Sequence, residues 1–193
     1  HFYIGRPESR VGLKIAGFVQ SGSYFMVGDD LPGVPPPPPN IASLVPADYL
    51  VREDISDASG LAFGTEVSFA DTGDFLVFRY KVNGLVGFDL LFTASSEMEC
   101  AGIEDPGIGP FYARGQLYGA VNAAVSIFVD LWVASGEKDI FTVGVVGMFQ
   151  CGFANPSWLK GFAHGHYDIL WGAVKGEATV PFQEGLHLFT IHI

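Results

Sequence analysis

The sequence predicts an all-β fold, more specifically an antiparallel β-sandwich of jelly-roll type with an extended N-terminal arm. Short apolar or alternating runs recur along the chain, and glycine, proline and aspartate separate them. Strand-favouring residues are abundant, with 17 Phe among 193 residues. No helical periodicity persists along the chain. These patterns indicate about eight to ten strands at the turn spacing typical of a sandwich.

The chain divides into three predicted parts. Residues 1–28 form a strand-like arm, because "VGLKIAGFVQ" and "SYFMVG" are apolar or alternating and contain glycines that discourage helix. Residues 29–40 contain five consecutive prolines, which favour a stiff, extended spacer. Residues 41–193 form the predicted sandwich domain. An apolar arm must bury itself on its own sheet or on that of a neighbouring copy. The residues expected to make this assembly contact are Val11, Leu13, Ile15, Phe18, Tyr24 and Phe25.

The predicted sandwich domain is a succession of strand signals. Two strands are expected around a tight "ADTGD" turn, followed by a hairpin turn at Asn83-Gly84. Further strands are expected in "LVGFDLLFTAS", "AAVSIFVDLWVA", "DIFTVGVVGMFQ", "YDILWGAV", "EATVPF" and "LHLFTIHI". The run "VSFADTGDFLVFRYKV" and the later "ASGEKDIFTVGVV" resemble, in pattern alone, the jelly rolls of tumour-necrosis-factor-type trimers.

Composition excludes some classes of partner. The chain has 21 acidic and 10 basic residues, a net charge of −11, and no cluster of Lys and Arg. A nucleic-acid partner is therefore not expected, because phosphate binding needs clustered positive charge. No membrane span is expected either, because no uninterrupted apolar run reaches about 18 residues. Charged residues make up only 16% of the chain, so either much of the surface is covered in an assembly or the core is unusually large. Cys100 and Cys151 are either one disulfide or two thiols.

Loop carboxylates suggest a possible calcium site. Asp54 and Asp57 lie in "REDISDASG", and Asp71 and Asp74 lie in "ADTGD". Turns can direct several such oxygens at one Ca²⁺ ion, although none of these loops has EF-hand spacing. The alternative is ordinary hydrogen bonding of Asp within turns. If calcium binds, exposed aromatic residues beside it would favour a calcium-dependent carbohydrate-binding module.

The first ten residues, "HFYIGRPESR", suggest a possible copper site. They contain the pattern His1, Tyr3, Ile4, Pro7, Ser9 and Arg10. This pattern resembles the mature start of lytic polysaccharide monooxygenases, whose fold is also a β-sandwich. The resemblance implies copper bound by the amine and ring of His1 and by a second histidine. His164 or His166 would be that ligand. On a strand these two histidines would also point to the same face, which suits two-point metal coordination. The alternative for both is a polar role in a glycine-flanked loop.

The sequence as a whole favours a structural role. It contains no nucleophile elbow, phosphate loop or HExxH motif. We therefore expect a non-enzymatic, exported protein, extracellular or at the cell surface. The sequence indicates no cofactor with certainty. The protein would self-assemble through its N-terminal strand into a filament, tube or other homo-oligomer. A copper-dependent oxidase using His1 is the first alternative, and the calcium-dependent carbohydrate-binding module is the second.

Overall fold

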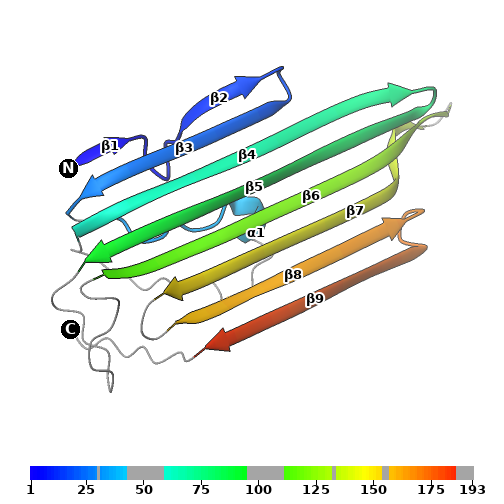
Figure 1. Cartoon of the computed structure of the whole chain (residues 1–193). Helices are drawn as coiled ribbons and strands as arrows, with labels where there is room; N and C mark the ends of the chain where they lie inside the picture. The colour runs from blue at the N-terminus through cyan, green and yellow to red at the C-terminus, as the bar shows by residue number, and fades with distance from the viewer. Residues whose placement is uncertain (30, 43–58, 95–110, 132–133, 154–156, 186–193) are drawn as a thin grey trace.

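A single nine-stranded sheet forms the protein in the computed structural model (Figure 1). The structure describes residues 1–29, 31–42, 59–94, 111–131, 134–153 and 157–185. The strands are β1 (Phe2–Ile4), β2 (Val11–Ile15), β3 (Val19–Gly28), β4 (Ser59–Phe75), β5 (Phe78–Ala94), β6 (Phe111–Leu131), β7 (Ala134–Phe153), β8 (Trp158–Ile169) and β9 (Val174–Gly185). One short helix, α1 (Pro39–Ala42), lies between β3 and β4 in the sequence.

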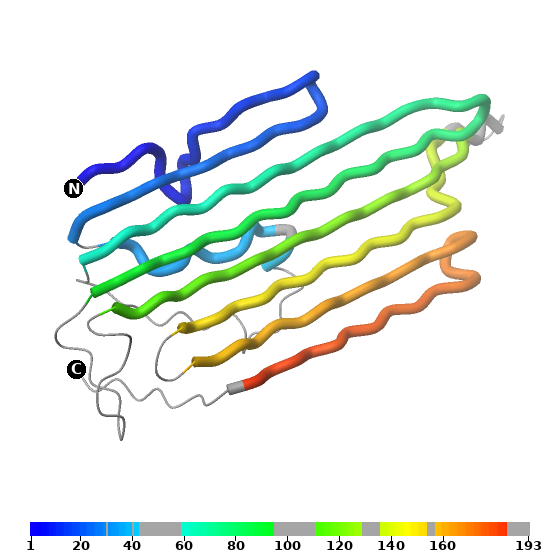
Figure 2. The backbone as a smooth tube through the Cα atoms, in the orientation of Figure 1, coloured from blue at the N-terminus to red at the C-terminus, as the bar shows by residue number. Residues whose placement is uncertain are grey.

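The strands are connected as a meander. Each strand from β3 to β9 pairs antiparallel with the next. Strands β1 and β2 both pair with β3 along its edge away from β4. Figure 2 shows the chain reversing direction at successive strand ends, so neighbours in sequence are neighbours in space. The sheet therefore has two edges, one formed by β1 and β2 and the other by β9.

The prediction of a nearly all-β, antiparallel protein is confirmed. The finer prediction of a jelly-roll sandwich is not confirmed, because all strands of the described residues belong to one sheet. The arm is likewise not seen as a separate unit. β3 pairs with β4 from Val19 opposite Phe69 to Gly28 opposite Gly60, so residues 1–28 continue the sheet.

Two predicted turns are wrong. The chain reverses at Leu76-Val77, after "ADTGD", whose residues all pair with β5. Asn83 and Gly84 pair with β4 on one side and β6 on the other, so they lie inside a strand. The glycines of these two segments, Gly73 and Gly84, lie against aromatic rings of neighbouring strands and not in turns. A side chain at Gly84 would meet the ring of Phe69 at 2.6 Å. Aromatic residues often cover strand glycines in this way.

The sheet has two unlike faces, because successive side chains on a strand point to opposite sides. We call the side that carries residues 31–42 the inner face, and the other side the outer face. On β5, Asp89, Leu91 and Thr93 point to the inner face and are buried. Val86 and Phe92 point to the outer face and are exposed.

The proline-rich segment lies across the inner face. Leu31 packs in a buried cluster with Tyr24, Ala62 and Leu91. Ile41 of α1 is fully buried against a second cluster, which contains Tyr118, Ala120, Val146, Met148 and Phe162. Figure 1 shows α1 behind the sheet at the level of β5 and β6. The segment predicted to be a spacer therefore covers part of the core.

Candidate interaction surface

The outer face of the sheet is the most extensive apolar surface of the described residues. Its exposed large side chains come from every strand and lie on the same side, as the strand register shows. Members from the middle of the sheet are Val67, Phe69, Val86, Leu117, Val121, Val145 and Phe149. Val86 is 54% exposed although it lies on a central strand. Such a contiguous apolar surface is typical of an interaction site.

Charged residues on the outer face are confined to its periphery. Among the described residues they are Asp71, Lys138 and Glu184. Asp71 and Lys138 lie towards the end of the sheet that carries the β4–β5 turn, and Glu184 lies towards the opposite end. The middle of the outer face is therefore apolar, and its few charges lie towards the two ends of the strands.

The N-terminal edge continues this apolar surface. Val11, Leu13 and Ile15 of β2 all point to the outer face and are more than half exposed. Phe18 is also half exposed, and Phe25 of β3 is partly exposed. Within the described chain, β2 pairs with β3 alone, so its other side is an open edge. Open edges present unpaired backbone groups that can recruit another strand.

Tyr24 differs from the other predicted assembly residues. It points to the inner face and is only 4% exposed, because Leu31 covers it. The Arg10 guanidinium lies over its ring at 5.1 Å. Burial, followed by the nearby negative charge of Asp89, raises the pKa of Tyr24 far above its ordinary value. Tyr24 therefore belongs to the core of its own chain.

A buried ion pair anchors the inner face. Arg10 Nη2 donates to Asp89 Oδ1 at 2.8 Å, and Asp89 is only 1% exposed. Gln116 Nε2 donates to Asp89 Oδ2 at 2.9 Å and to the Pro35 carbonyl at 2.7 Å. Burial alone would lower the pKa of Arg10, but Asp89 opposes this effect and the net pKa is raised. The cluster therefore joins the N-terminal edge, a central strand and the proline-rich segment.

Sequence reasoning missed this cluster, although one signal pointed to it. Asp89 is a lone acid within the apolar run "GFDLLF". A charge in such a place is almost never fully buried unless it is paired. Its partner could not be identified, because Arg10 lies 79 residues away along the chain.

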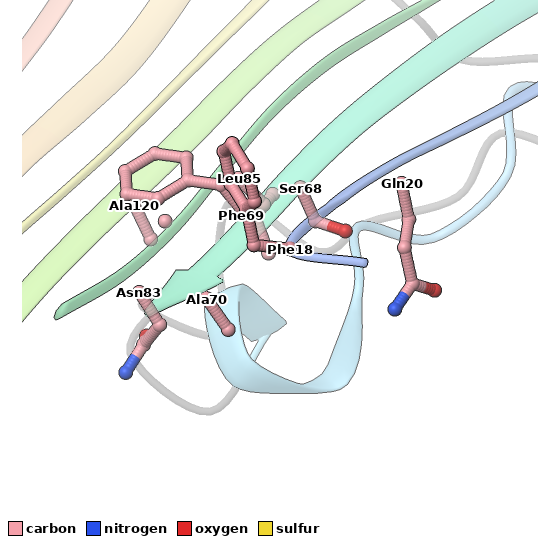
Figure 3. A pocket seen from close by; sticks show the side chains of 9 residues that line it. Phe18, Gln20, Ser68, Phe69, Ala70, Asn83, Leu85 and Ala120 are labelled. Carbon is pink, nitrogen blue, oxygen red and sulfur yellow. The ribbon is translucent and has the colours of Figure 1, made fainter. Parts of the chain in front are cut away.

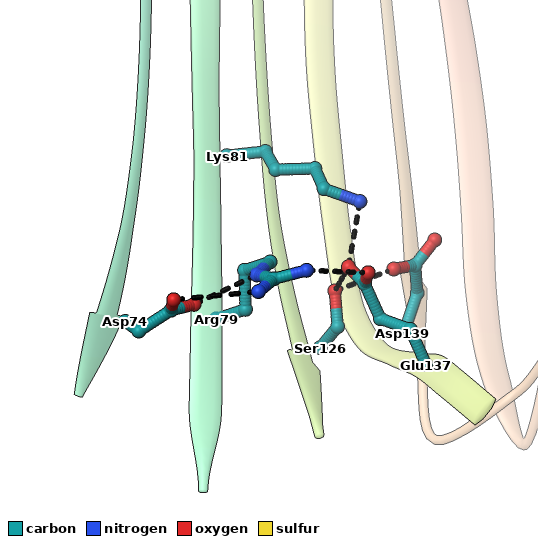
Figure 4. A network of polar contacts seen from close by, with 6 residues as sticks. All are labelled: Asp74, Arg79, Lys81, Ser126, Glu137 and Asp139. Carbon is teal, nitrogen blue, oxygen red and sulfur yellow. Dashed lines mark hydrogen bonds and ion pairs between the residues drawn. The ribbon is translucent and has the colours of Figure 1, made fainter. Parts of the chain in front are cut away.

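A second polar network lies on the inner face near the β4–β5 turn (Figure 4). Arg79 bridges Asp74 at 2.7 Å and Glu137 at 3.2 Å, and Lys81 Nζ lies 2.6 Å from Glu137. The hydrogen bonds from Lys81 and then from Ser126 lower the pKa of Glu137 to about 2. The hydrogen bond from Arg79 likewise lowers the pKa of Asp74. The network joins β4, β5, β6 and β7 at this end of the sheet.

The structure does not bring the predicted calcium ligands together. Asp71 accepts a hydrogen bond from Tyr80 on the outer face, whereas Asp74 pairs with Arg79 on the inner face. Asp54 and Asp57 lie outside the described residues. No group of three His, Cys, Asp or Glu side chains suited to a metal ion occurs in the described ranges.

The predicted copper ligands lie near opposite edges of the sheet. His1 precedes β1 and lies beside Gly28, while His164 and His166 are on β8. The two β8 histidines share the inner face, as their spacing indicated, and their ring centres are 6.0 Å apart. His164 Nδ1 is 2.7 Å from the Thr179 hydroxyl. Strands β3 to β7 separate His1 from both, so the three do not form one site.

One small cavity of about 200 Å³ lies beside Phe18 and Leu85 (Figure 3). All its lining residues are uncharged, and they include Gln20, Ser68 and Asn83. Its volume is below the roughly 300 Å³ at which ligand pockets usually begin. It therefore offers neither the space nor the acid–base groups of a catalytic site.

No family model, curated protein or solved structure matches the chain. Among the described residues, no helix has the length and apolar character to cross a membrane. The free thiol of Cys151 is half-buried on β7, where burial raises its pKa, and Cys100 lies outside the described residues.

Proposed function

We propose that this chain is a non-enzymatic structural protein, exported or at the cell surface, that self-associates through its N-terminal edge. The observation that carries the proposal is the open β2 edge with its exposed Val11, Leu13 and Ile15. An exposed apolar edge strand is a template for pairing with another chain. Covering it would remove both unpaired backbone groups and apolar surface from water.

Among the described residues, β9 forms a second open edge, at which pairing would continue. Strand β9 ends the sheet on the other side, and its Val180 and Val174 are more than half exposed. If β2 of one copy pairs with β9 of the next, the contact is head-to-tail. Such contacts generate rings when the rotation closes and filaments when it does not. Either product is an assembly of the kind that the sequence suggested.

In this proposal, the sandwich predicted from the sequence forms only when two chains assemble. A sandwich requires a second sheet over an apolar face, at a spacing of about 10 Å. In one chain the outer face has no second sheet among the described residues. We therefore infer that the second layer comes from another chain.

Charge substitution in β2 tests the edge. The variant with Leu13→Lys and Ile15→Lys should stop end-to-end growth, because two ammonium groups at the edge oppose strand pairing. The matched control is Lys14→Gln, on the same strand but facing the other side. Sedimentation velocity over a concentration series, with negative-stain microscopy, reads out the assembly. Unchanged growth in the double variant would contradict a role for this edge.

A further inference from the structure

We propose that the outer face packs against the outer face of a second copy, so that two chains form a two-layer β-sandwich. The inference rests on the proposed self-association and names a second contact for it. The contact is distinct from the β2 edge, because it involves the middle of the sheet. Its centre lies between β5 and β6, the fourth and fifth of the eight positions in the strand order.

The outer face is large enough for a stable pair. Strand β3 is the shortest of the seven strands from β3 to β9, with 10 residues. At about 3.4 Å per residue and about 4.8 Å between strands, that common length covers roughly 1,000 Å². A standard protein interface buries about 800 Å² on each partner. Side chains that are left 40–60% exposed in one chain would be covered in the pair.

The two halves of the outer face differ in side-chain volume in a complementary way. Across one level of the sheet, Val67 and Val86 on β4 and β5 continue into Gly119 and Gly147 on β6 and β7. A twofold axis along the strands, between β5 and β6, exchanges these halves. It sets each valine of one copy over a glycine of the other.

The next level of the sheet contains Phe69, Gly84, Val121 and Val145, so the axis places Phe69 of one copy over Val145 of the other. Gly84 on β5 is paired with Val121 on β6, which is 48% exposed. Because the ring of Phe69 already covers Gly84 on the outer face, Val121 of the second copy would pack against that ring. Interdigitation of large and small residues is how packed layers avoid voids.

The peripheral groups are also compatible with this pairing. The axis brings β4 of one copy over β7 of the other, so that Asp71 faces Val143 and Lys138 faces Phe75, and both charges stay at the periphery of the face. The hydroxyls of Ser23 and Thr65 are hydrogen-bonded to each other at 2.8 Å, so they can be covered without losing a partner. A lipid surface would not require the placement of valine over glycine in the level of Val67, Val86, Gly119 and Gly147. These observations therefore favour a second copy over lipid.

Two substitutions at the centre of the face test the proposal. In the variant with Val86→Lys and Val121→Lys, burying four ammonium groups between the sheets is unfavourable. The full chain, this face variant, the β2-edge variant and their combination are compared by sedimentation velocity. We expect multilayer assemblies for the wild type, single-layer chains for the face variant, dimers for the edge variant and monomers for the combination. Far-UV circular dichroism verifies that each variant retains its sheet.

A label at Val86 provides a readout that does not depend on the lysine variants. Val86→Cys, with Cys100 and Cys151 replaced by serine, carries a nitroxide near the proposed axis. We expect dipolar coupling between copies at roughly 20 Å, because packed sheets lie about 10 Å apart and the labels add length. The matched label at exposed Glu8→Cys, in the turn between β1 and β2, should show no such coupling.

The failures of the two proposals are distinguishable. A wild type that is monomeric at every concentration contradicts self-association as a whole. A wild type that assembles, while the face variant assembles equally and the Val86 labels show no coupling, overturns the face-to-face contact alone. Flotation of a monomer with phosphatidylcholine vesicles, lost in the face variant, would overturn it in favour of lipid.

Discussion

At the scale of single residues, the Arg10–Asp89 pair makes the strongest demand on the fold. Asp89 is buried beneath the proline-rich segment and has charge compensation from Arg10 at 2.8 Å. Removing one partner of a buried pair leaves the other charge uncompensated. We expect Arg10→Gln to lower the free energy of unfolding by about 3 kcal/mol in urea denaturation. Arg6→Gln, at an exposed arginine near the same edge, should change it by less than about 0.5 kcal/mol.

Glu137 gives the inner network a defined pH dependence. Its pKa in the folded chain is lowered from 4.5 to about 2, first by the hydrogen bond from Lys81. A lowered folded pKa means that its contribution to stability is present above pH 4.5 and is lost as the pH falls towards 2. We expect the melting temperatures of wild type and Glu137→Gln to differ at pH 7 and to converge near pH 2. Glu8→Gln, the exposed control, should show no convergence; a constant difference for Glu137→Gln would contradict the assignment.

At the scale of elements, Ile41 attaches the segment between β3 and β4 to the sheet. It is fully buried, and it contacts a cluster that spans β6, β7 and β8. We expect Ile41→Ala to cost about 2–5 kcal/mol of unfolding free energy. Hydrogen exchange should increase in residues 31–42 before it increases in the strands. Ile4→Ala, at an exposed position on β1, should have a much smaller effect and leave exchange in that segment unchanged.

The β4–β5 turn contains a residue in an unfavourable backbone conformation. Leu76 has a φ of +58° and is 86% exposed, so its side chain stabilises little there. The left-handed region costs an L-residue other than glycine roughly 1–2 kcal/mol. Since glycine loses more freedom on folding, we expect Leu76→Gly to stabilise the chain by about 0.5–1 kcal/mol. Val77→Gly, at a residue with negative φ, should destabilise it, and thermal unfolding distinguishes the two results.

The turn also shows why the sequence predicted strand content better than strand ends. Alternation identified the strands because it is a local property of each run. The glycines of "ADTGD" and "NG" were interpreted as turns, but Gly73 and Gly84 lie under rings from neighbouring strands. That role depends on cross-strand register, which one run of sequence does not contain. The true turn, Leu76-Val77, carries no turn residue.

The candidate surface was predictable in part for the same reason. Alternation in β2 indicated that Val11, Leu13 and Ile15 share a face, and the register shows that they do. The same argument could not reveal that Tyr24 is covered by Leu31, because that contact depends on how the proline-rich segment crosses the sheet. Nor could it reveal that His1 and the β8 histidines are separated by five strands, β3 to β7.

At the scale of the whole molecule, the described residues form a single sheet with one apolar face and two open edges. Residues 31–42 cover part of the inner face, where polar groups are paired in two networks. The outer face has no such cover within the described chain, although it carries most of the exposed aromatic and aliphatic residues. Removing such a surface from water is strongly favourable, at about 25 cal/mol per Å². In our proposal, self-association would supply that cover, both along the edges and between the faces.

The most direct test of this account is sedimentation velocity of the full chain over a wide concentration series. A single chain has a mass of 20.7 kDa. We expect the weight-average mass to rise with concentration to multiples of this value, and to do so less in the variants of the β2 edge and of the outer face. One species of 20.7 kDa at every concentration would contradict the central claim that this sheet is completed by other copies of itself.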